Sequence, residues 1–94
     1  MGLPEAYFLA EWYCQDLADA PVHPTAARLD GAVAEVSADG TPIRLLGVIA
    51  LPGDAMLFGV FIAASARVVA QVCERAGMSA QRITSAAGVH LRMC

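Results

Sequence analysis

One acidic residue lies in the middle of a stretch that is otherwise aromatic and aliphatic. The stretch from Tyr7 to Cys14 reads YFLAEWYC, which is typical of a β-strand, and Glu11 falls near its centre. Strand alternation places Glu11 on one face with Tyr7, Leu9 and Tyr13. A carboxylate buried there without a partner would be costly. Glu11 is therefore either a structural residue or a functional carboxylate that acts as an acid–base group or a metal ligand.

The structural interpretation of Glu11 needs a partner for its charge. Arg44 and Arg82 each fall within a predicted strand and are candidate partners. Water between two subunits would serve the same purpose. The sequence leaves these alternatives open.

The chain has two histidines, and each could take part in a site that assembles in space. His23 lies between Val22 and Pro24, where a loop is expected to enter the first helix, and His90 closes the last predicted strand. Neither has a second histidine at metal-ligand spacing. A metal site would therefore combine Glu11, His23 and His90, with an interfacial aspartate. Such nitrogen and oxygen ligands would suit Ni, Co, Zn or Mn. For catalysis, the candidate acid–base groups are Glu11 and His90.

Aromatic residues supply a second kind of candidate site. Aromatic side chains on a sheet usually belong to the core, but some could line a cavity for a small molecule between sheet and helices. The candidate ligand-binding residues are Tyr7, Trp12, Tyr13, Phe58 and Phe61.

The three cysteines, Cys14, Cys73 and Cys94, are an odd number and include no C-x-x-C pair. This argues against a disulfide framework and predicts a cytoplasmic protein. Cys73 falls on an apolar helical stripe and is expected to be a core residue.

The bulk composition limits the class of protein. Ninety-four residues make one domain, residues 1–94, with residues 1–6 expected to form a loose N-terminal arm. Six basic residues against nine acidic ones give a net charge of −3, which argues against binding to nucleic acid or to a membrane surface. The N-terminus lacks the basic region of a signal peptide.

The elements that must position these residues follow from the apolar pattern. Residues 43–51 and 55–63 read as two strands joined by a turn at Pro52-Gly53-Asp54, and this charged break argues against a membrane span over residues 43–64. A helix is expected over residues 24–39, and a second is expected to begin with Ser65 as its cap and to stop at Gly77. Residues 81–91 supply the last strand. The order β-α-β-β-α-β predicts a ferredoxin-like α+β fold, a four-stranded antiparallel sheet with two helices on one face.

The helix-free face of that sheet is expected to be apolar. Two alternatives for the first hairpin strand are Leu45, Gly47, Ile49 and Leu51 or Leu46, Val48 and Ala50; for the second they are Met56, Phe58, Val60 and Ile62 or Leu57, Gly59 and Phe61. The chain is 57% hydrophobic, more than one small core can hold. A homodimer, with two sheets packed face to face as a dimeric α+β barrel, would bury the excess. A similar subunit, or pairing of strand edges, is the alternative.

Four segments carry a resemblance to known proteins: Leu9-Ala10-Glu11-Trp12, Phe61-Ile62-Ala63-Ala64-Ser65, Arg75-Ala76-Gly77 and Arg82-Ile83. They resemble a family of small bacterial ferredoxin-like proteins, mostly uncharacterised, one branch of which is described as nickel-binding. The resemblance implies the fold, the dimer and Glu11 as a site residue. A wider kinship by fold is with dimeric α+β-barrel proteins, which include cofactor-free monooxygenases, cyclases and sensory ligand-binding modules.

Three functional hypotheses follow. The first is a small cytoplasmic homodimer that binds a metal ion or small ligand and does no catalysis. The second is a small cofactor-free enzyme, of monooxygenase, isomerase or cyclase type, with an aromatic-lined cavity and Glu11 or His90 as its acid–base group. The third is an interaction subunit that docks on another protein by its sheet face.

Overall fold

A computed structural model of the chain describes residues 6–13 and 22–86. Its elements, in chain order, are β1 (Ala6–Tyr13), α2 (Val22–Ala38), β2 (Ile43–Leu51), the short 3-10 helix η1 (Pro52–Asp54), β3 (Met56–Ala63), α3 (Ala66–Arg75) and β4 (Arg82–Ala86). Of the N-terminal arm predicted at residues 1–6, Ala6 begins β1, and the rest lies outside the described residues. The same holds for residues 87–91 of the last predicted strand.

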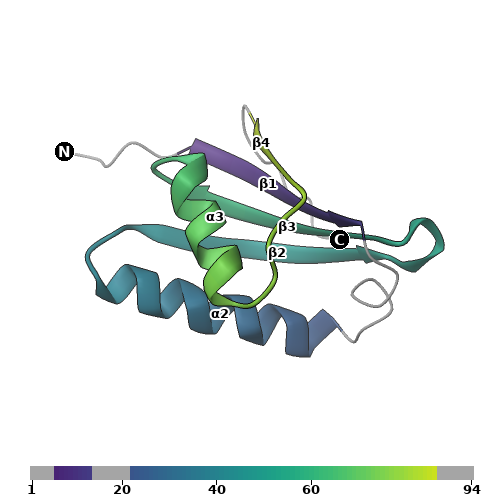
Figure 1. The fold of residues 1–94 in the computed structure, drawn as a ribbon, viewed down its shortest axis with the longest axis horizontal. Helices are drawn as coiled ribbons and strands as arrows, with labels where there is room; N and C mark the ends of the chain where they lie inside the picture. The colour runs from purple at the N-terminus through teal and green to yellow at the C-terminus, as the bar shows by residue number, and fades with distance from the viewer. Residues whose placement is uncertain (1–5, 14–21, 87–94) are drawn as a thin grey trace, which may run out of the picture.

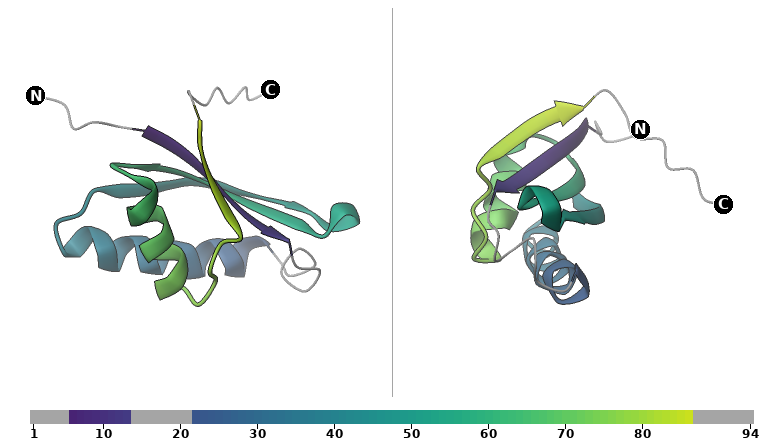
Figure 2. Two further views of the ribbon diagram at one scale, coloured as in Figure 1. Left: turned by 45° about the horizontal axis from the view of Figure 1, so that its top comes forward. Right: turned by 90° about the vertical axis from the view of Figure 1, so that its right-hand side faces the viewer.

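The four strands form one antiparallel sheet in the order β2-β3-β1-β4. Both helices lie on one side of this sheet: α2 runs beside β2, and α3 crosses the strands (Figure 1). The views in Figure 2 show the same layering from two further directions. This is the ferredoxin-like α+β fold that the pattern of elements predicts.

The β2–β3 hairpin is confirmed close to its predicted bounds. Pro52 to Asp54 make the turn, but the residue in the left-handed conformation is Ala55, at φ 54°, rather than Gly53. The amide of Ala55 donates to the carbonyl of Pro52 at 3.1 Å. Residues 43–64 are thus mainly two strands, and within the described part of the chain neither helix is long and apolar enough to cross a membrane.

The helix ends differ from the sequence prediction in two details. Helix α2 begins at Val22 rather than at Pro24, so His23 lies in its first turn instead of in a loop. The predicted side-chain cap of Ser65 on α3 is wrong, because its hydroxyl makes no capping bond. The first turn is closed by the backbone instead, where the amide of Val68 donates to the carbonyl of Ser65 at 3.2 Å.

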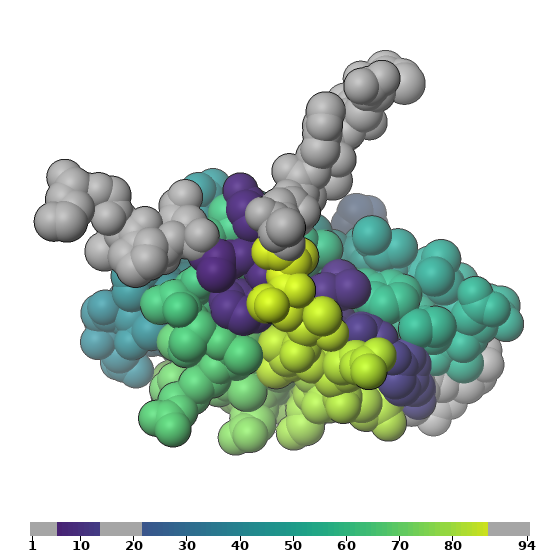
Figure 3. Space-filling view, turned by 90° about the horizontal axis from the view of Figure 1, so that it is seen from above, coloured from purple at the N-terminus to yellow at the C-terminus, as the bar shows by residue number. Residues whose placement is uncertain are grey.

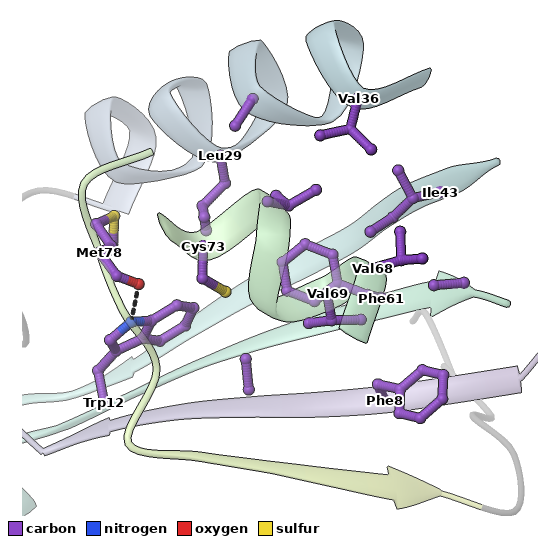
Figure 4. Packing of buried hydrophobic residues seen from close by; sticks show 14 of the residues in the cluster. Phe8, Trp12, Leu29, Val36, Ile43, Phe61, Val68, Val69, Cys73 and Met78 are labelled. Carbon is purple, nitrogen blue, oxygen red and sulfur yellow. Dashed lines mark hydrogen bonds between the residues drawn. The ribbon is translucent and has the colours of Figure 1, made fainter. Parts of the chain in front are cut away.

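The core lies between the sheet and the helices (Figure 4). The indole of Trp12 is 2% exposed and donates through Nε1 to the carbonyl oxygen of Met78 at 2.7 Å, so the one polar atom of the ring is satisfied. The ring lies against Gly59: a Cβ built there would be 3.2 Å from Cη2 of Trp12 and 3.0 Å from Cε1 of Phe61. Glycine at this position therefore makes room for the largest side chain of the core.

A bulge in β2 decides which residues face away from the helices. Leu45 pairs with Phe61 and Gly47 with Val60, so Leu46 is an extra residue in the ladder. Leu45 packs against the core before the bulge, and Val48 does so after it. Neither of the two strictly alternating sets predicted for this strand is therefore correct. The bulge shifts the alternation by one residue within the strand.

Candidate functional site

The helix-free face of the sheet presents its side chains as four rows that run from β4 across β1 and β3 to β2. The rows are Ala86, Tyr7, Ile62 and Arg44; then Thr84, Leu9, Val60 and Gly47; then Arg82, Glu11, Phe58 and Ile49; and last Tyr13, Met56 and Leu51. Residues on β3 and most of those on β2 are apolar, whereas β1 and β4 contribute the polar groups. Figure 3 looks onto the β4 side of the molecule and shows β4, in yellow, beside β1 in purple.

Glu11 lies in the third row and is only 8% exposed, although neither of the helices described, α2 and α3, covers this side of the sheet. Its carboxylate accepts a hydrogen bond from the hydroxyl of Tyr13, two residues along the same face. Its backbone carbonyl accepts from the amide of Gln81 at 2.8 Å, and the Gln81 side chain in turn accepts from the amide of Tyr13. Glu11 is thus fixed in position by the residues around it.

Of the two candidate arginines, Arg82 is the neighbour of Glu11. It lies directly opposite Glu11 on β4, whereas Arg44 lies two strands away in another row. The structural interpretation of Glu11 is therefore supported in part: its direct hydrogen-bond partner is a tyrosine, and an arginine lies beside the pair.

The hydrogen bond to Glu11 raises the pKa of the Tyr13 phenol above its ordinary value of 10.0. Partial loss of solvation and the negative charge of Glu11 act in the same direction, while Arg82 lowers the pKa by a smaller amount. Arg82 therefore lies close enough to influence the phenol as well. Glu11, Tyr13 and Arg82 form one polar cluster, which is called the Glu11 cluster below.

Apolar side chains surround the Glu11 cluster and reach solvent. Ile49 is 52% exposed and Leu51 is 40% exposed, and both lie on β2 near the end of the hairpin. Phe58 and Leu9 lie half-buried beside Glu11. A nearly buried carboxylate therefore lies among apolar side chains on the face opposite to α2 and α3.

Comparison with solved structures identifies a protein of the same architecture. The chain is similar in fold to SCO4226 from Streptomyces coelicolor A3(2). The TM-score to the SCO4226 crystal structure is 0.68, and the match covers 90% of this chain and 100% of SCO4226 at 20% sequence identity. No protein-family model matches the chain, and a comparison with curated proteins gives no match. At this identity SCO4226 establishes the ferredoxin-like fold, so the site must be argued from the residues of this chain.

The structure divides the five predicted ligand-binding aromatics between the two sides of the sheet. Tyr7, Tyr13 and Phe58 lie on the helix-free face; Tyr13 and Phe58 are neighbours of Glu11, whereas Tyr7 lies two rows away. Trp12 and Phe61 lie in the core, 2% and 0% exposed. The five therefore do not line one cavity, because neighbours along a strand point to opposite faces.

The predicted metal ligands are not brought together within the described residues. His23 is exposed in the first turn of α2, on the side of the sheet opposite to Glu11. His90, the other catalytic and metal candidate, lies outside the described residues. Over residues 6–13 and 22–86, no three His, Cys, Asp or Glu side chains form a group that could hold a metal ion. The match to SCO4226 shows the fold alone, so it assigns no metal ligand in this chain.

Sequence reasoning missed Tyr13 and Gln81 as partners of Glu11. Tyr13 could have been found, because residues two apart on a strand share a face and a phenol can reach a neighbouring carboxylate. Gln81 could not, because its place beside β1 depends on the path of the linker between α3 and β4.

Proposed function

We propose that this protein is a small, non-catalytic, homodimeric binding protein that holds a small ligand on its helix-free sheet face, against the Glu11 cluster. The observation that carries the proposal is Glu11 itself, a carboxylate that is 8% exposed on the side of the sheet opposite to α2 and α3. Burying a carboxylate is costly, so a ligand or a partner explains such a side chain better than packing alone does.

A second copy is the cover that the face requires. The four strands have eight, nine, eight and five residues. At about 3.3 Å per residue along a strand and about 4.8 Å between strands, they cover roughly 480 Å². Two such faces bury roughly 950 Å², close to the lower limit of about 1,000 Å² for a specific interface. Half of the sheet would fall short, so the contact extends over β1 and the Glu11 cluster lies inside it.

The chemistry of the Glu11 cluster favours an organic ligand over a bare cation. Arg82 places a positive charge beside Glu11, which opposes the binding of a metal ion at that carboxylate. A ligand with a hydrogen-bonding group would address Glu11 and Arg82, and its apolar part would pack on Phe58 and Leu9. A metal ion would need further ligands, from the second copy or from His90. Elemental analysis distinguishes a bound metal ion from an organic ligand.

Mass spectrometry of the untagged protein as purified tests the ligand. We expect the native dimer to carry an additional mass, with elemental analysis reporting whether that mass is a metal. Glu11→Gln should lose it, because the amide removes the charge while keeping the shape. Glu74→Gln, the same change at an exposed site on α3, should retain it. A wild-type dimer with neither bound molecule nor metal would count against a binding function.

Gly47 and Gly31 provide a matched test of the dimer. A Cβ at either glycine meets no heavy atom within 4 Å, and neither has a positive φ, so both accept a side chain without strain in the monomer. Gly47 lies on the helix-free face and Gly31 on the exposed side of α2. Light scattering should show a dimer for the wild type and Gly31→Glu and a monomer for Gly47→Glu. A wild-type monomer, or a dimeric Gly47→Glu, would contradict face-to-face assembly.

A further inference from the structure

We infer how the second copy sits: a two-fold axis in the plane of the interface, perpendicular to the strands, places Ile49 of each copy over Gly47 of the other. The inference rests on the proposed homodimer and goes beyond it in naming the contact that fixes the arrangement. It also makes the Glu11 cluster a site shared by both copies.

Gly47 and Ile49 are complementary in shape. Ile49, at 52%, is the most exposed of the large hydrophobic residues in the described part of the chain. Gly47 lies two residues earlier on the same face of β2. No heavy atom of the same copy lies within 4 Å of the position that a Cβ would take there. The exposed isoleucine of one copy thus finds, on the identical surface of the other, a position that can accept it.

Two-fold symmetry makes this contact reciprocal. In an interface between identical surfaces, if residue i touches residue j of the second copy, then j touches i. An axis perpendicular to the strands reverses the order of the rows and keeps each strand opposite its own counterpart. An axis that passes between the second and third rows then brings Ile49 opposite Gly47 in both directions.

The polarity of the rows favours this axis over one parallel to the strands. A parallel axis would place β2 opposite β4 of the second copy and β3 opposite β1, so Ile49 would cover Arg82. Burying that charge under an apolar side chain is unfavourable, whereas the perpendicular axis places Thr84 of the second copy over Arg82. The perpendicular axis instead packs the apolar strands β2 and β3 against their own copies.

The same axis brings the two Glu11 clusters to one place. Glu11 lies in the third row, next to the axis, and faces Leu9 of the second copy. The two carboxylates therefore lie in adjacent rows on either side of the axis, each bonded by its own Tyr13. The dimer has a single polar site, bounded on two sides by equivalent Glu11, Tyr13 and Arg82 groups and incomplete in one copy alone.

Exchanging the two residues tests the arrangement. Gly47→Ile fills the acceptor position and Ile49→Gly removes the residue that occupies it, so each single variant should raise the dimer dissociation constant by about tenfold or more. The double variant, Gly47→Ile with Ile49→Gly, re-creates the contact with its halves reversed. Its dissociation constant should return to within about threefold of the wild-type value. Sedimentation equilibrium measures the constants, and circular dichroism confirms the fold of each variant.

A mixing experiment gives an independent readout. Isotope-labelled double variant and unlabelled wild type should form homodimers and few heterodimers by native mass spectrometry, because a mixed dimer sets isoleucine against isoleucine. If a glycine substitution at position 49 prevents folding, the milder pair Gly47→Val and Ile49→Ala replaces it, with the same expectation.

The outcomes separate this inference from the proposed function. If the wild type is a dimer but the double variant has a dissociation constant as high as that of the weaker single variant, the arrangement is overturned. The homodimer itself would still stand. Free mixing with the wild type would overturn the arrangement as well. A wild-type monomer would overturn both.

Discussion

At the scale of single residues, the hydrogen bond between Tyr13 and Glu11 controls the acid–base behaviour of the phenol. Because the bond raises the pKa of Tyr13 above 10.0, Glu11→Gln should lower it. Titration of tyrosinate absorbance in a Tyr7→Phe background reports Tyr13 alone, since the chain has two tyrosines. An unchanged or higher pKa in the Glu11→Gln variant would show that the bond does not govern the phenol.

The direction of this pKa shift fixes its effect on stability. A phenol whose folded pKa is raised binds its proton more tightly in the folded state than in the unfolded state. Its contribution is therefore complete below pH 10 and is lost as the pH rises through the folded pKa. Chemical denaturation above pH 10 should show this loss in the wild type, and Tyr13→Phe should remove it.

Cys73 also has a displaced pKa. Burial raises the pKa of its thiol to about 12, with a smaller contribution from the charge of Glu74. In a variant with Cys14 and Cys94 changed to serine, Cys73 should therefore resist a thiol reagent at neutral pH until the protein unfolds. Fast labelling of the folded protein would contradict the packing of α3 on the sheet.

By the same linkage, the Cys73 thiol contributes stability below pH 9, and this contribution is lost as the pH rises toward 12.

The face on which Glu11 lies, with Tyr13 as a neighbour, could be predicted from the sequence, but the arginine beside the pair could not. Strand alternation was sufficient to place Glu11 on a face with Tyr7, Leu9 and Tyr13. The choice between Arg44 and Arg82 depends on which strands become neighbours and in what register. No local pattern around Glu11 contains that information.

At the scale of elements, Gly59 allows β3 to pass beneath the ring of Trp12. Gly59→Ala should destabilise the fold by about 1–3 kcal/mol, because the new Cβ would lie 3.0 Å from Phe61 and 3.2 Å from a ring that its bond to Met78 holds in place. Gly53→Ala adds the same group in the exposed turn η1, where nothing lies within 4 Å, and should change the stability by less than about 0.5 kcal/mol. Urea denaturation of both variants measures the difference. Equal stabilities would show that the ring can move aside.

The elements themselves follow closely from apolar spacing and from turn residues. Strand β2 begins and ends where the sequence predicts, and the positive φ of Gly77, at 75°, matches its predicted role at the end of the second helix. The sequence could not show the bulge at Leu46, because the run from Leu45 to Leu51 is apolar at nearly every position and has no alternation to interrupt. The side-chain cap at Ser65 was also wrong, since a backbone bond fills that role.

At the scale of the whole molecule, the fold has two layers and one uncovered face. The order of elements predicts this architecture, because right-handed crossovers bring both helices to one side of the sheet. In the proposed dimer the other face is covered by a second molecule, and the position of that molecule does not follow from the sequence or the fold of one copy. The homodimer is for this reason a proposal that solution measurements must decide.

Assembly should make the stability of the wild type depend on concentration. Because only folded copies associate, raising the protein concentration should raise the melting temperature of a dimer. Gly47→Glu, expected to be monomeric, should melt at the same temperature across the range. A wild-type melting temperature that does not change with dilution would argue that the helix-free face is uncovered.

The extra residue of β2 affects how homologous sequences can diverge in length. Leu46 has no counterpart in β3, while Leu45 and Gly47 oppose the consecutive residues Phe61 and Val60. Losing Leu46 would shorten the chain and leave every other side chain of the strand on its present side. Insertions and deletions, usually confined to loops, are thus permitted at one point inside this sheet. Homologues aligned to this chain should accept a one-residue gap there and still display the same surface.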